Sequence, residues 1–499
     1  MKKTLLLIAG VVAHLAAIAQ TDELTVTLTE AGQLPELVGD ANKMQVKSLT
    51  VVGDINGTDI AYIREMAQGT MNYMTWQRTA NLQVLDLSGA NLVEGGSAYS
   101  MSWPYPEVET GVIGEDMFYN CVSLIELRLP KNITRICKRG INNNTLLAEL
   151  TLPEGLQVIE QWGIYWSPSL TSLDLPSTLE QIESFAFYGC AIEEITLTSN
   201  NLQFESSSFS GLSSLKNFHV NADNQSYASV DGVLYTKDLS VLMLYPGGRT
   251  DASYELPSQT KEIGDYGFYD NGNLQEVLMP EGLDRIGDYA FDGDTSLGNL
   301  QFPSTLKSVG RYAFVACRNM TEADFSGTQL ETVGDNAFFG VQSLAVVKLS
   351  STLKRVGASA FTGNTYKELD LPATLEYIGE YGFRNEYLEV VRAHGMTPAV
   401  CEGDVFGQNY RATILNKDRI CPLYVPVGAK EAYEEADGFK SFYTVIEDES
   451  LTTGIERAAT ADAHSSVWFS LDGKRTVTPR KGFAIERKAD GSVRKYIVK

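Results

Sequence analysis

The sequence predicts a repeat solenoid, in which small units stack along one axis and each packs only against its neighbours. Phenylalanine or isoleucine recurs five residues after a β-branched or aromatic residue, and this anchor pair returns about every 23 residues. One coil buries too few apolar side chains to offset the entropy of ordering it, so coils must share surface. The anchor pairs are Ile113 with Phe118, Ile136 with Ile141, Ile159 with Ile164, Ile182 with Phe187, Phe204 with Phe209, Ile263 with Phe268, Ile286 with Phe291, Val309 with Phe314, Val333 with Phe338, Val356 with Phe361, and Ile378 with Phe383.

Each coil reads L-x-x-L-x-L-P, then a polar turn, then I-G-x-x-A-F. In residues 170–190 the alternation of Leu173 and Leu175 predicts a short strand, which Pro176 ends because proline cannot donate to the next ladder bond. A glycine follows most anchors, which indicates a positive φ or a close backbone approach there. We expect about eleven coils of 22–24 residues, with their strands forming a parallel β-sheet on the concave face.

The residue pattern of the coils resembles that of a known family. Segments such as IGDYAFDGDTSL at 286–297 and SVGRYAFVACRNM at 308–320 are similar to the BspA-like leucine-rich repeats of exported bacterial proteins. The resemblance covers roughly residues 24–447, and includes a hairpin insert, ASVDGVLYTKDLSVLMLYPGG, and a closing cap with a short helix at about 428–437. It implies a leucine-rich-repeat solenoid with adhesin-like roles, including binding of host matrix proteins by some members.

The ends of the chain predict export. Lys2 and Lys3 precede an apolar run that ends in a small-x-small triplet before Gln20, which is typical of a signal peptide. No later segment approaches 18 continuous apolar residues, so no transmembrane span is expected. Residues 467–499 resemble the C-terminal domains of Bacteroidota exported proteins, some of which are sorting signals; a small β-appendage without a sorting role is the alternative. We expect an outer-surface or extracellular location.

Six segments follow from these patterns. They are 1–19, a signal peptide; 20–110, an N-terminal cap with the first irregular leucine-rich coils; 111–395, the BspA-like repeats with a β-hairpin insert at about 222–255; 396–447, a C-terminal cap; 448–466, a linker; and 467–499, a small C-terminal β domain.

The net charge limits the classes of partner that the protein can bind, and the cysteine positions argue against a disulfide framework. The net charge is −23, and residues 451–499 alone carry +5, so the rest of the chain carries −28. Such a body repels phosphate backbones and anionic membranes, which argues against nucleic-acid binding and favours basic or metal-bridged partners. Cys121, Cys190 and Cys317 occupy one repeated slot too far apart for disulfides, where we expect small apolar fillers. Whether Cys401 and Cys421 pair stays open.

Catalytic motifs are scarce. His219, His394 and His464 lie in different contexts, and no H-E-x-x-H, G-x-S-x-G, phosphate-binding glycine loop or paired C-x-x-C occurs. We therefore expect no enzymatic activity, no cofactor and no metal site.

Acidic residues gather on the outward strand positions. Nine of the twenty positions beside the middle strand leucine are acidic and two are Lys or Arg, whereas acids make up about one residue in eight overall. Stacked carboxylates repel, which folding alone does not require. The pattern favours a recognition face, or else a solvated face that prevents edge aggregation. The candidate residues are Glu126, Glu149, Asp174, Glu194, Glu276, Glu322, Asp324, Glu368 and Asp370.

Aromatic residues give two smaller signals. Tyr99, Trp103 and Tyr105 lie in a loop at 93–110, either as a contact site or as a flap over the first open coil. A tyrosine also stands two residues before the repeat phenylalanine in four coils, where we expect it to pack between coils; these are Tyr266, Tyr289, Tyr312 and Tyr381.

The sequence thus predicts a non-catalytic, exported or cell-surface protein that binds another protein through an acidic concave strand face. The expected partner is a host matrix or bacterial surface protein, possibly a basic one. The alternative is a glycan- or envelope-directed structural scaffold.

Overall fold

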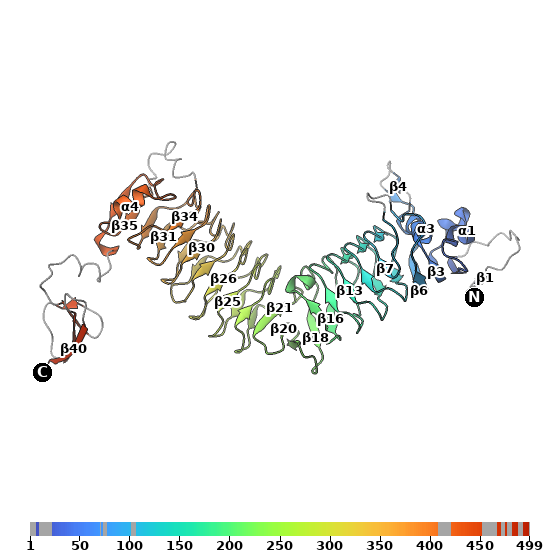
Figure 1. Cartoon of the computed structure of the whole chain (residues 1–499), viewed down its shortest axis with the longest axis horizontal. Helices are drawn as coiled ribbons and strands as arrows, with labels where there is room; N and C mark the ends of the chain where they lie inside the picture. Colours follow the sequence, from blue (N-terminus) through green and yellow to red (C-terminus); the bar gives the residue numbers. More distant parts are fainter. Residues whose placement is uncertain are drawn as a thin grey trace.

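A curved solenoid of parallel strands forms most of the chain (Figure 1). The structure is a computed structural model, and it describes residues 6–8, 22–69, 71–72, 77–100, 106–407, 421–451, 467–470, 475–476, 482–487 and 493–498. The predicted solenoid class is confirmed. The solenoid has about 17 turns, however, rather than eleven. Counting anchor pairs gives too few turns because six turns have no such pair. Two of these turns lie at the N-terminal end, one at the insert and three at the C-terminal end.

Three faces surround the core of each coil. The outer face holds the L-x-x-L-x-L segments, which pair in parallel register, with Leu127 opposite Leu150. Leucines turn inward and their neighbours turn to solvent, as the alternation predicts. The outer strands are β2 (Glu23–Thr27), β3 (Ser48–Ile55), β6 (Val84–Leu92), β9 (Glu126–Arg128), β12 (Glu149–Thr151), β16 (Glu194–Leu197), β18 (Asn217–Val220), β22 (Ser253–Glu255), β24 (Glu276–Leu278), β27 (Glu322–Asp324), β29 (Val346–Lys348), β31 (Glu368–Leu371), β33 (Val390–Ala393), β35 (Leu423–Val425) and β36 (Val445–Glu447), with β1 (Leu6–Ile8) paired to β2.

The side face holds the first residue of each anchor pair. Ile136 pairs in register with Ile113 on one side and Ile159 on the other. The strands form a sheet of five and then, beyond the insert, most of a sheet of ten. They are β7 (Val112–Ile113), β10 (Arg135–Ile136), β13 (Val158–Ile159), β15 (Gln181–Ile182) and β17 (Gln203–Phe204), then β21 (Val241–Leu244), β23 (Glu262–Ile263), β25 (Arg285–Ile286), β26 (Ser308–Val309), β28 (Thr332–Val333), β30 (Arg355–Val356), β32 (Tyr377–Ile378) and β34 (Val400–Cys401).

The inner face is the tight turn after each anchor, such as residues 264–272. It begins as a sheet of β8 (Phe118–Tyr119), β11 (Ile141–Asn142) and β14 (Ile164–Tyr165), and its later coils keep the same ladder as turns. The Phe268 N–H, for example, donates to the Ala290 carbonyl at 2.7 Å. Behind this ladder the buried phenylalanines from Phe268 to Phe383 stack with centroids 4.8–5.4 Å apart.

Glycine follows the anchor because neighbouring coils approach closely, not because φ is positive. A Cβ on Gly310 would lie 2.5 Å from the backbone of Gly287, and Gly310 is not among the residues with positive φ. The left-handed position comes two residues later and is held by side-chain-bearing residues, such as Tyr289 with φ 57° and Tyr312 with φ 56°. The second alternative from the sequence is therefore the right one.

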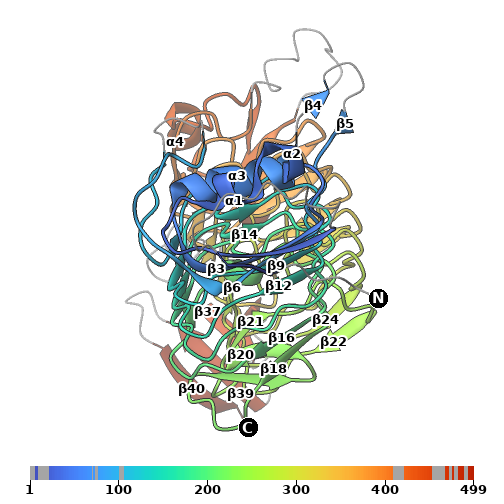
Figure 2. The same cartoon turned by 90° about the vertical axis from the view of Figure 1, so that its right-hand side faces the viewer.

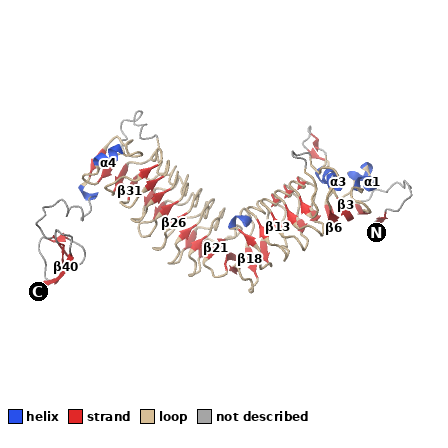
Figure 3. Ribbon diagram, viewed as in Figure 1, coloured by secondary structure: helices blue, strands red, loops and turns tan. Residues whose placement is uncertain are grey.

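Helices cap both ends of the solenoid (Figure 3). α3 begins at Gly57, with Asn56 as its N-cap: the Asn56 side chain accepts from the Thr58 N–H. The helices are α1 (Leu34–Val38), α2 (Asp40–Lys43), α3 (Gly57–Gln68), η1 (Ser206–Phe209), α4 (Lys430–Glu435) and η4 (Glu449–Leu451). The remaining strands are β4 (Met71–Asn72) with β5 (Gln77–Arg78), and an antiparallel C-terminal sheet of β37 (Val467–Ser470), β38 (Arg475–Thr476), β39 (Gly482–Arg487) and β40 (Val493–Val498).

The insert bends the solenoid. β19 (Tyr227–Val230) and β20 (Val233–Thr236) form an antiparallel hairpin against β18, where the Phe218 N–H donates to the Gly232 carbonyl at 2.8 Å. The hairpin turn thus meets β18 of the outer face, while β20 pairs with β21 in the ten-stranded side-face sheet, so the extra strands fill the step between β18 and β22. On the inner face η1 and the turn at Tyr245 span the same step, so the outer side is longer. The solenoid therefore curves toward its inner face.

The curvature corrects the predicted orientation of the sheet. Figures 1 and 2 show α1 and α3 on the hollow side of the crescent, with β3, β9 and β12 away from it. The L-x-x-L-x-L strands thus lie on the convex face, not on the concave face. The outer ladder is interrupted at 171–175 and 298–301. At the second break the Asn299 side chain accepts from the N–H groups of Thr321 and Glu322 in place of a backbone carbonyl.

Candidate functional site

The nine predicted acidic residues all lie on the outer face, and therefore on the convex side. Glu126, Glu322 and Asp324 are half-buried, and the other six are exposed. Their column is less uniformly negative than the sequence predicts, because basic side chains from neighbouring coils lie between them.

Lys348 neutralises the acidic pair of the preceding coil. Its Nζ lies 2.7 Å from Glu322 Oε1 and 2.8 Å from Asp324 Oδ2. Partial burial alone would raise the pKa of Asp324, but hydrogen bonds from Lys348 and Ser326 outweigh it and lower that pKa to about 2. Glu322 and Asp324 are thus engaged within the protein.

At both ends of the row of acidic residues, an arginine likewise neutralises the carboxylates. Arg128 Nη2 lies 2.6 Å from Glu126 Oε1, and Arg128 Nη1 lies 3.0 Å from Asp86 Oδ2. At the other end Arg392 Nη1 lies 2.8 Å from Glu368 Oε2. The sequence columns missed Asp86 and Arg392 because they stop one coil short of each on the two sides.

Asp370 completes the group of charges around Arg392. It lies 3.3 Å from His394 Nε2 and 3.6 Å from Arg392 Nη1. The hydrogen bond with His394, followed by the charge of Arg392, lowers the pKa of Asp370 despite partial burial. Before the insert, His219 Nε2 lies 3.4 Å from Glu194 Oε2. The two histidines in the described part of the chain therefore both lie beside carboxylates of the outer face.

Three candidates keep uncompensated carboxylates. Glu149, Asp174 and Glu276 are exposed, and no ion pair within the described part of the chain engages them. Glu149 and Asp174 lie in consecutive coils. These three side chains are available to an outside partner, whereas the others must first give up a partner of their own.

Comparisons with known proteins identify the repeat. A family model described as the BspA type leucine rich repeat region matches six copies, at residues 111–229 and 261–389. The chain is a BspA-type leucine-rich repeat protein. The alternation that aims the nine acids outward is thus a property of this repeat, and their charge is a property of this chain.

The chain is also similar to several solved structures. The pneumococcal vaccine antigen PcpA is 21% identical over 68% of this chain and 86% of its own, with a TM-score of 0.44. A leucine-rich repeat protein from Eubacterium ventriosum is 18% identical over 78% and 91%, with a TM-score of 0.46, and one from Bacteroides ovatus is 21% identical over 70% and 90%, with a TM-score of 0.40. No curated protein matches the chain.

The predicted aromatic loop is only partly described. Tyr99 is 3% exposed, and its hydroxyl donates to the Glu115 carbonyl at 2.9 Å. Tyr99 is therefore not an exposed contact residue, because the flap packs it onto the first coil under Arg64, whose guanidinium lies 5.9 Å from the ring. Trp103 and Tyr105 lie outside the described residues.

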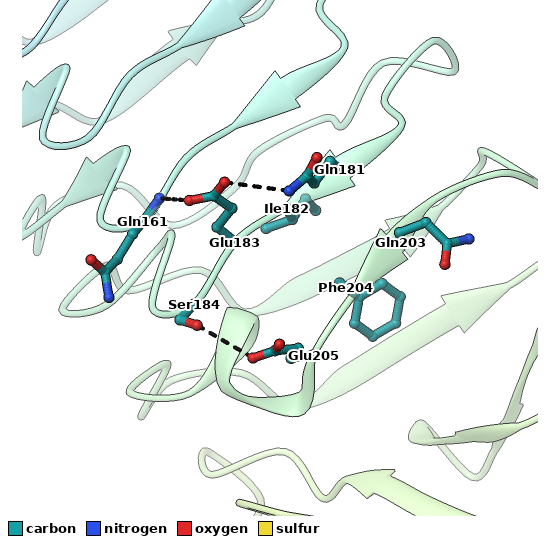
Figure 4. Close-up of a pocket in the computed structure, with 8 residues that line it drawn as sticks. All are labelled: Gln161, Gln181, Ile182, Glu183, Ser184, Gln203, Phe204 and Glu205. Atoms are coloured by element: carbon teal, nitrogen blue, oxygen red, sulfur yellow. Dashed lines mark hydrogen bonds between the residues drawn. The ribbon is translucent and has the colours of Figure 1, made fainter.

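A polar pocket of about 580 Å³ opens on the side face where the ladder stops at β17 (Figure 4). Its polar groups bond one another: the Glu183 carboxylate accepts from the Gln161 N–H at 3.0 Å and from the Gln181 amide at 3.3 Å. Ser184 donates to Glu205 at 3.4 Å. The pocket is therefore a break in the sheet with its own internal bonds.

Three further observations on the described residues concern metal ligands, membrane-spanning helices and disulfides. No group of three or more His, Cys, Asp or Glu side chains in that part of the chain could hold a metal ion. No helix there is both long and apolar enough to cross a membrane. Cys401 carries a free thiol, so it does not pair with Cys421 in this structure.

Proposed function

We propose that this protein is an exported, non-catalytic surface protein that binds another protein in an adhesin-like role. The uncompensated carboxylates of Glu149, Asp174 and Glu276 carry the proposal, because a face of exposed acids recruits a partner with a complementary basic patch. The partner is a host matrix or bacterial surface protein. The convex side also suits a broad contact, since it presents the strand face outward along the solenoid.

Charge reversal tests the binding face. The purified protein is immobilised and exposed to host extracellular-matrix and bacterial-surface extracts at low and high salt. The triple variant Glu149→Lys, Asp174→Lys, Glu276→Lys should lose a captured basic protein, and high salt should weaken capture by the parent. The matched control reverses Glu107, Glu180 and Glu376, exposed acids outside the outward strand positions, and should retain capture. Identical capture by both variants contradicts the proposed face.

Export is the second part of the proposal. Residues 1–19 would act as a cleaved signal peptide and residues 467–499 as a sorting domain. Deleting 467–499 should prevent the protein from reaching the outer surface of the outer membrane. Surface display that survives the deletion would contradict the sorting role. A glycan- or envelope-directed scaffold, the alternative function, predicts surface retention that the charge reversals leave unchanged.

A further inference from the structure

An aromatic pocket of about 460 Å³ lies on the inner face, beside the bend. None of the nine acidic strand residues lines it, because it is built from the turns of the inner face. Tyr269 comes from beyond the insert, so the bend brings it into the lining of the pocket. The lining residues are Arg139, Trp162, Tyr165, Phe185, Tyr188 and Tyr269.

Glycines hold two of the neighbouring rings flat against the backbone. A Cβ on Gly189 would lie 2.6 Å from the Trp166 indole, and one on Gly211 would overlap the Tyr188 ring. Tyr165 and Tyr188 stack with centroids 5.9 Å apart and planes 16° apart. Trp166, which is 46% exposed, extends this surface beyond the pocket. Tyr188 therefore lies between the Tyr165 ring and the Gly211 backbone, so its hydroxyl, and not a free ring face, is its contribution to the pocket.

The fold does not require aromatic side chains at these positions. Trp162 and Phe185 occupy the left-handed position of their coils, with φ 56° and 58°, where neighbouring coils use Asp116 and Arg139. Left-handed backbone is unfavourable for a bulky side chain. In the other limb Tyr266 stacks on Tyr289 at 4.9 Å, so packing explains the tyrosines there. Trp162 and Phe185 have no such stacked ladder and line a cavity instead.

The charge of the pocket selects a neutral ligand. Among the described residues, Arg139 is the one charged lining residue, and its guanidinium is already bound to Glu115 at 2.6 Å and Asp116 at 3.3 Å. No carboxylate from the described part of the chain lines the pocket to attract a cation, and the chain's charge of −23 repels anions. The phenol hydroxyls of Tyr165, Tyr188 and Tyr269 can both donate and accept hydrogen bonds.

We propose that this pocket binds a neutral glycan, with a sugar ring stacked on the Trp162 face that lines the pocket and sugar hydroxyls bonded to the phenols of Tyr165, Tyr188 and Tyr269. Neutral sugars combine apolar ring faces with hydroxyls that both donate and accept, which is the chemistry that this lining offers. A proline-rich peptide also docks on aromatic grooves, but its prolines offer carbonyl acceptors without N–H donors. The site lies on the opposite side of the solenoid from the acidic strand face, so either proposal can fail without the other.

Affinity gel electrophoresis of the whole protein tests the site. The gels contain one neutral polysaccharide each: hydroxyethyl cellulose, a β-1,3-glucan, galactomannan, arabinoxylan or dextran. At least one should retard the protein, and Trp162→Ala and Tyr188→Ala should each weaken that retardation at least tenfold. Tyr188→Phe keeps the ring between Tyr165 and Gly211 without its hydroxyl and should also weaken the retardation, which covers the case that the alanine variant misfolds.

The matched control is Tyr119→Ala, an exposed inner-face tyrosine outside the pocket, which should bind like the parent. Decaproline is titrated separately by calorimetry. The proposal is overturned if none of the five polysaccharides retards the protein, if retardation persists in both Trp162→Ala and Tyr188→Ala, or if decaproline alone binds in a Trp162-dependent way.

Discussion

Phe185 and Tyr266 lie edge to face across the inside of the bend, with ring centroids 5.7 Å apart and planes at 88°. They come from the two limbs on either side of the insert. The hairpin lengthens the outer side of the solenoid, and this aromatic contact closes the inner side. The two limbs also bury separate apolar clusters, which interleave at the insert: Leu234 belongs to the first and Tyr235 to the second.

A double-mutant cycle on Phe185 and Tyr266 should reveal coupling across the bend. Edge-to-face pairs contribute roughly 0.5–1.5 kcal/mol beyond the area that they bury. Phe185→Ala and Tyr266→Ala should therefore be non-additive by about that amount in urea unfolding. The cycle of Phe185→Ala with Tyr381→Ala, a residue of the same type several coils away, should be additive. Additivity in both cycles would show that the two limbs are joined by the backbone ladder alone.

Replacing Gly310 with alanine should destabilise the C-terminal limb. Its Cβ would lie 2.5 Å from Gly287 carbonyl atoms of the previous coil, and overpacking of this kind costs about 1–3 kcal/mol. Gly327→Ala is the matched control, because nothing lies within 4 Å of a Cβ there and its φ is not positive. Thermal unfolding should show a lower midpoint for Gly310→Ala only. An unchanged midpoint would mean that the coils slide apart without cost.

The core was predictable from the sequence because the anchor spacing reports burial directly. Phe268 and Phe291 stack where the 23-residue period puts them. The direction of curvature was not predictable. It depends on how closely glycines such as Gly310 let the inner turns approach, and on which face the insert lengthens. A period in sequence does not distinguish the long side of a coil from the short side.

The binding surfaces were predictable to different degrees. Outward acids such as Glu149 follow from strand alternation, but the compensation of Asp370 by His394 needed the next coil to be placed in register. The inner aromatic pocket was out of reach, since Phe185 and Tyr269 meet only after the 222–255 segment folds as a hairpin. Sequence periodicity predicts contacts between successive coils and misses those that an insert creates.

Asp294 should make stability fall as pH rises. Its side chain is fully buried, Oδ1 accepts from the Asn271 N–H at 2.7 Å, and Oδ2 has no hydrogen-bond partner among the described residues. Burial, and then the charges of Asp270 and Asp292, raise the pKa of Asp294 well above its usual value. Below about pH 4 the carboxyl is protonated in both states, so nothing is lost. As pH rises toward the folded pKa, the unfolded state ionises first and stability decreases.

Asp294→Asn tests this titration. Asparagine already fills the same slot at positions 144, 271 and 364, so the amide fits. The variant should match the parent at pH 3.5 and exceed it at pH 8 by roughly 1–3 kcal/mol, the cost of a buried unsatisfied polar group. Asp324→Asn should behave oppositely, since the lowered pKa of Asp324 stabilises the protein above about pH 4. Thermal midpoints from pH 3.5 to 8 decide both, and a pH-independent difference for Asp294→Asn would rule out the titration.

Cys137 should be the first of the repeat-region thiols to react. Burial raises the pKa of Cys121 and of Cys190 to about 12, whereas that of Cys137, which is half-buried, rises to about 11. Because only the thiolate is nucleophilic, both exposure and pKa favour Cys137. Native protein treated with iodoacetamide at pH 8 should be modified at Cys137 before Cys121, Cys190 and Cys317, as read by peptide mass spectrometry. Urea-unfolded protein is the control, in which all four should react at similar rates. Early modification of Cys317 in the native protein would show that its coil opens more readily than its packing indicates.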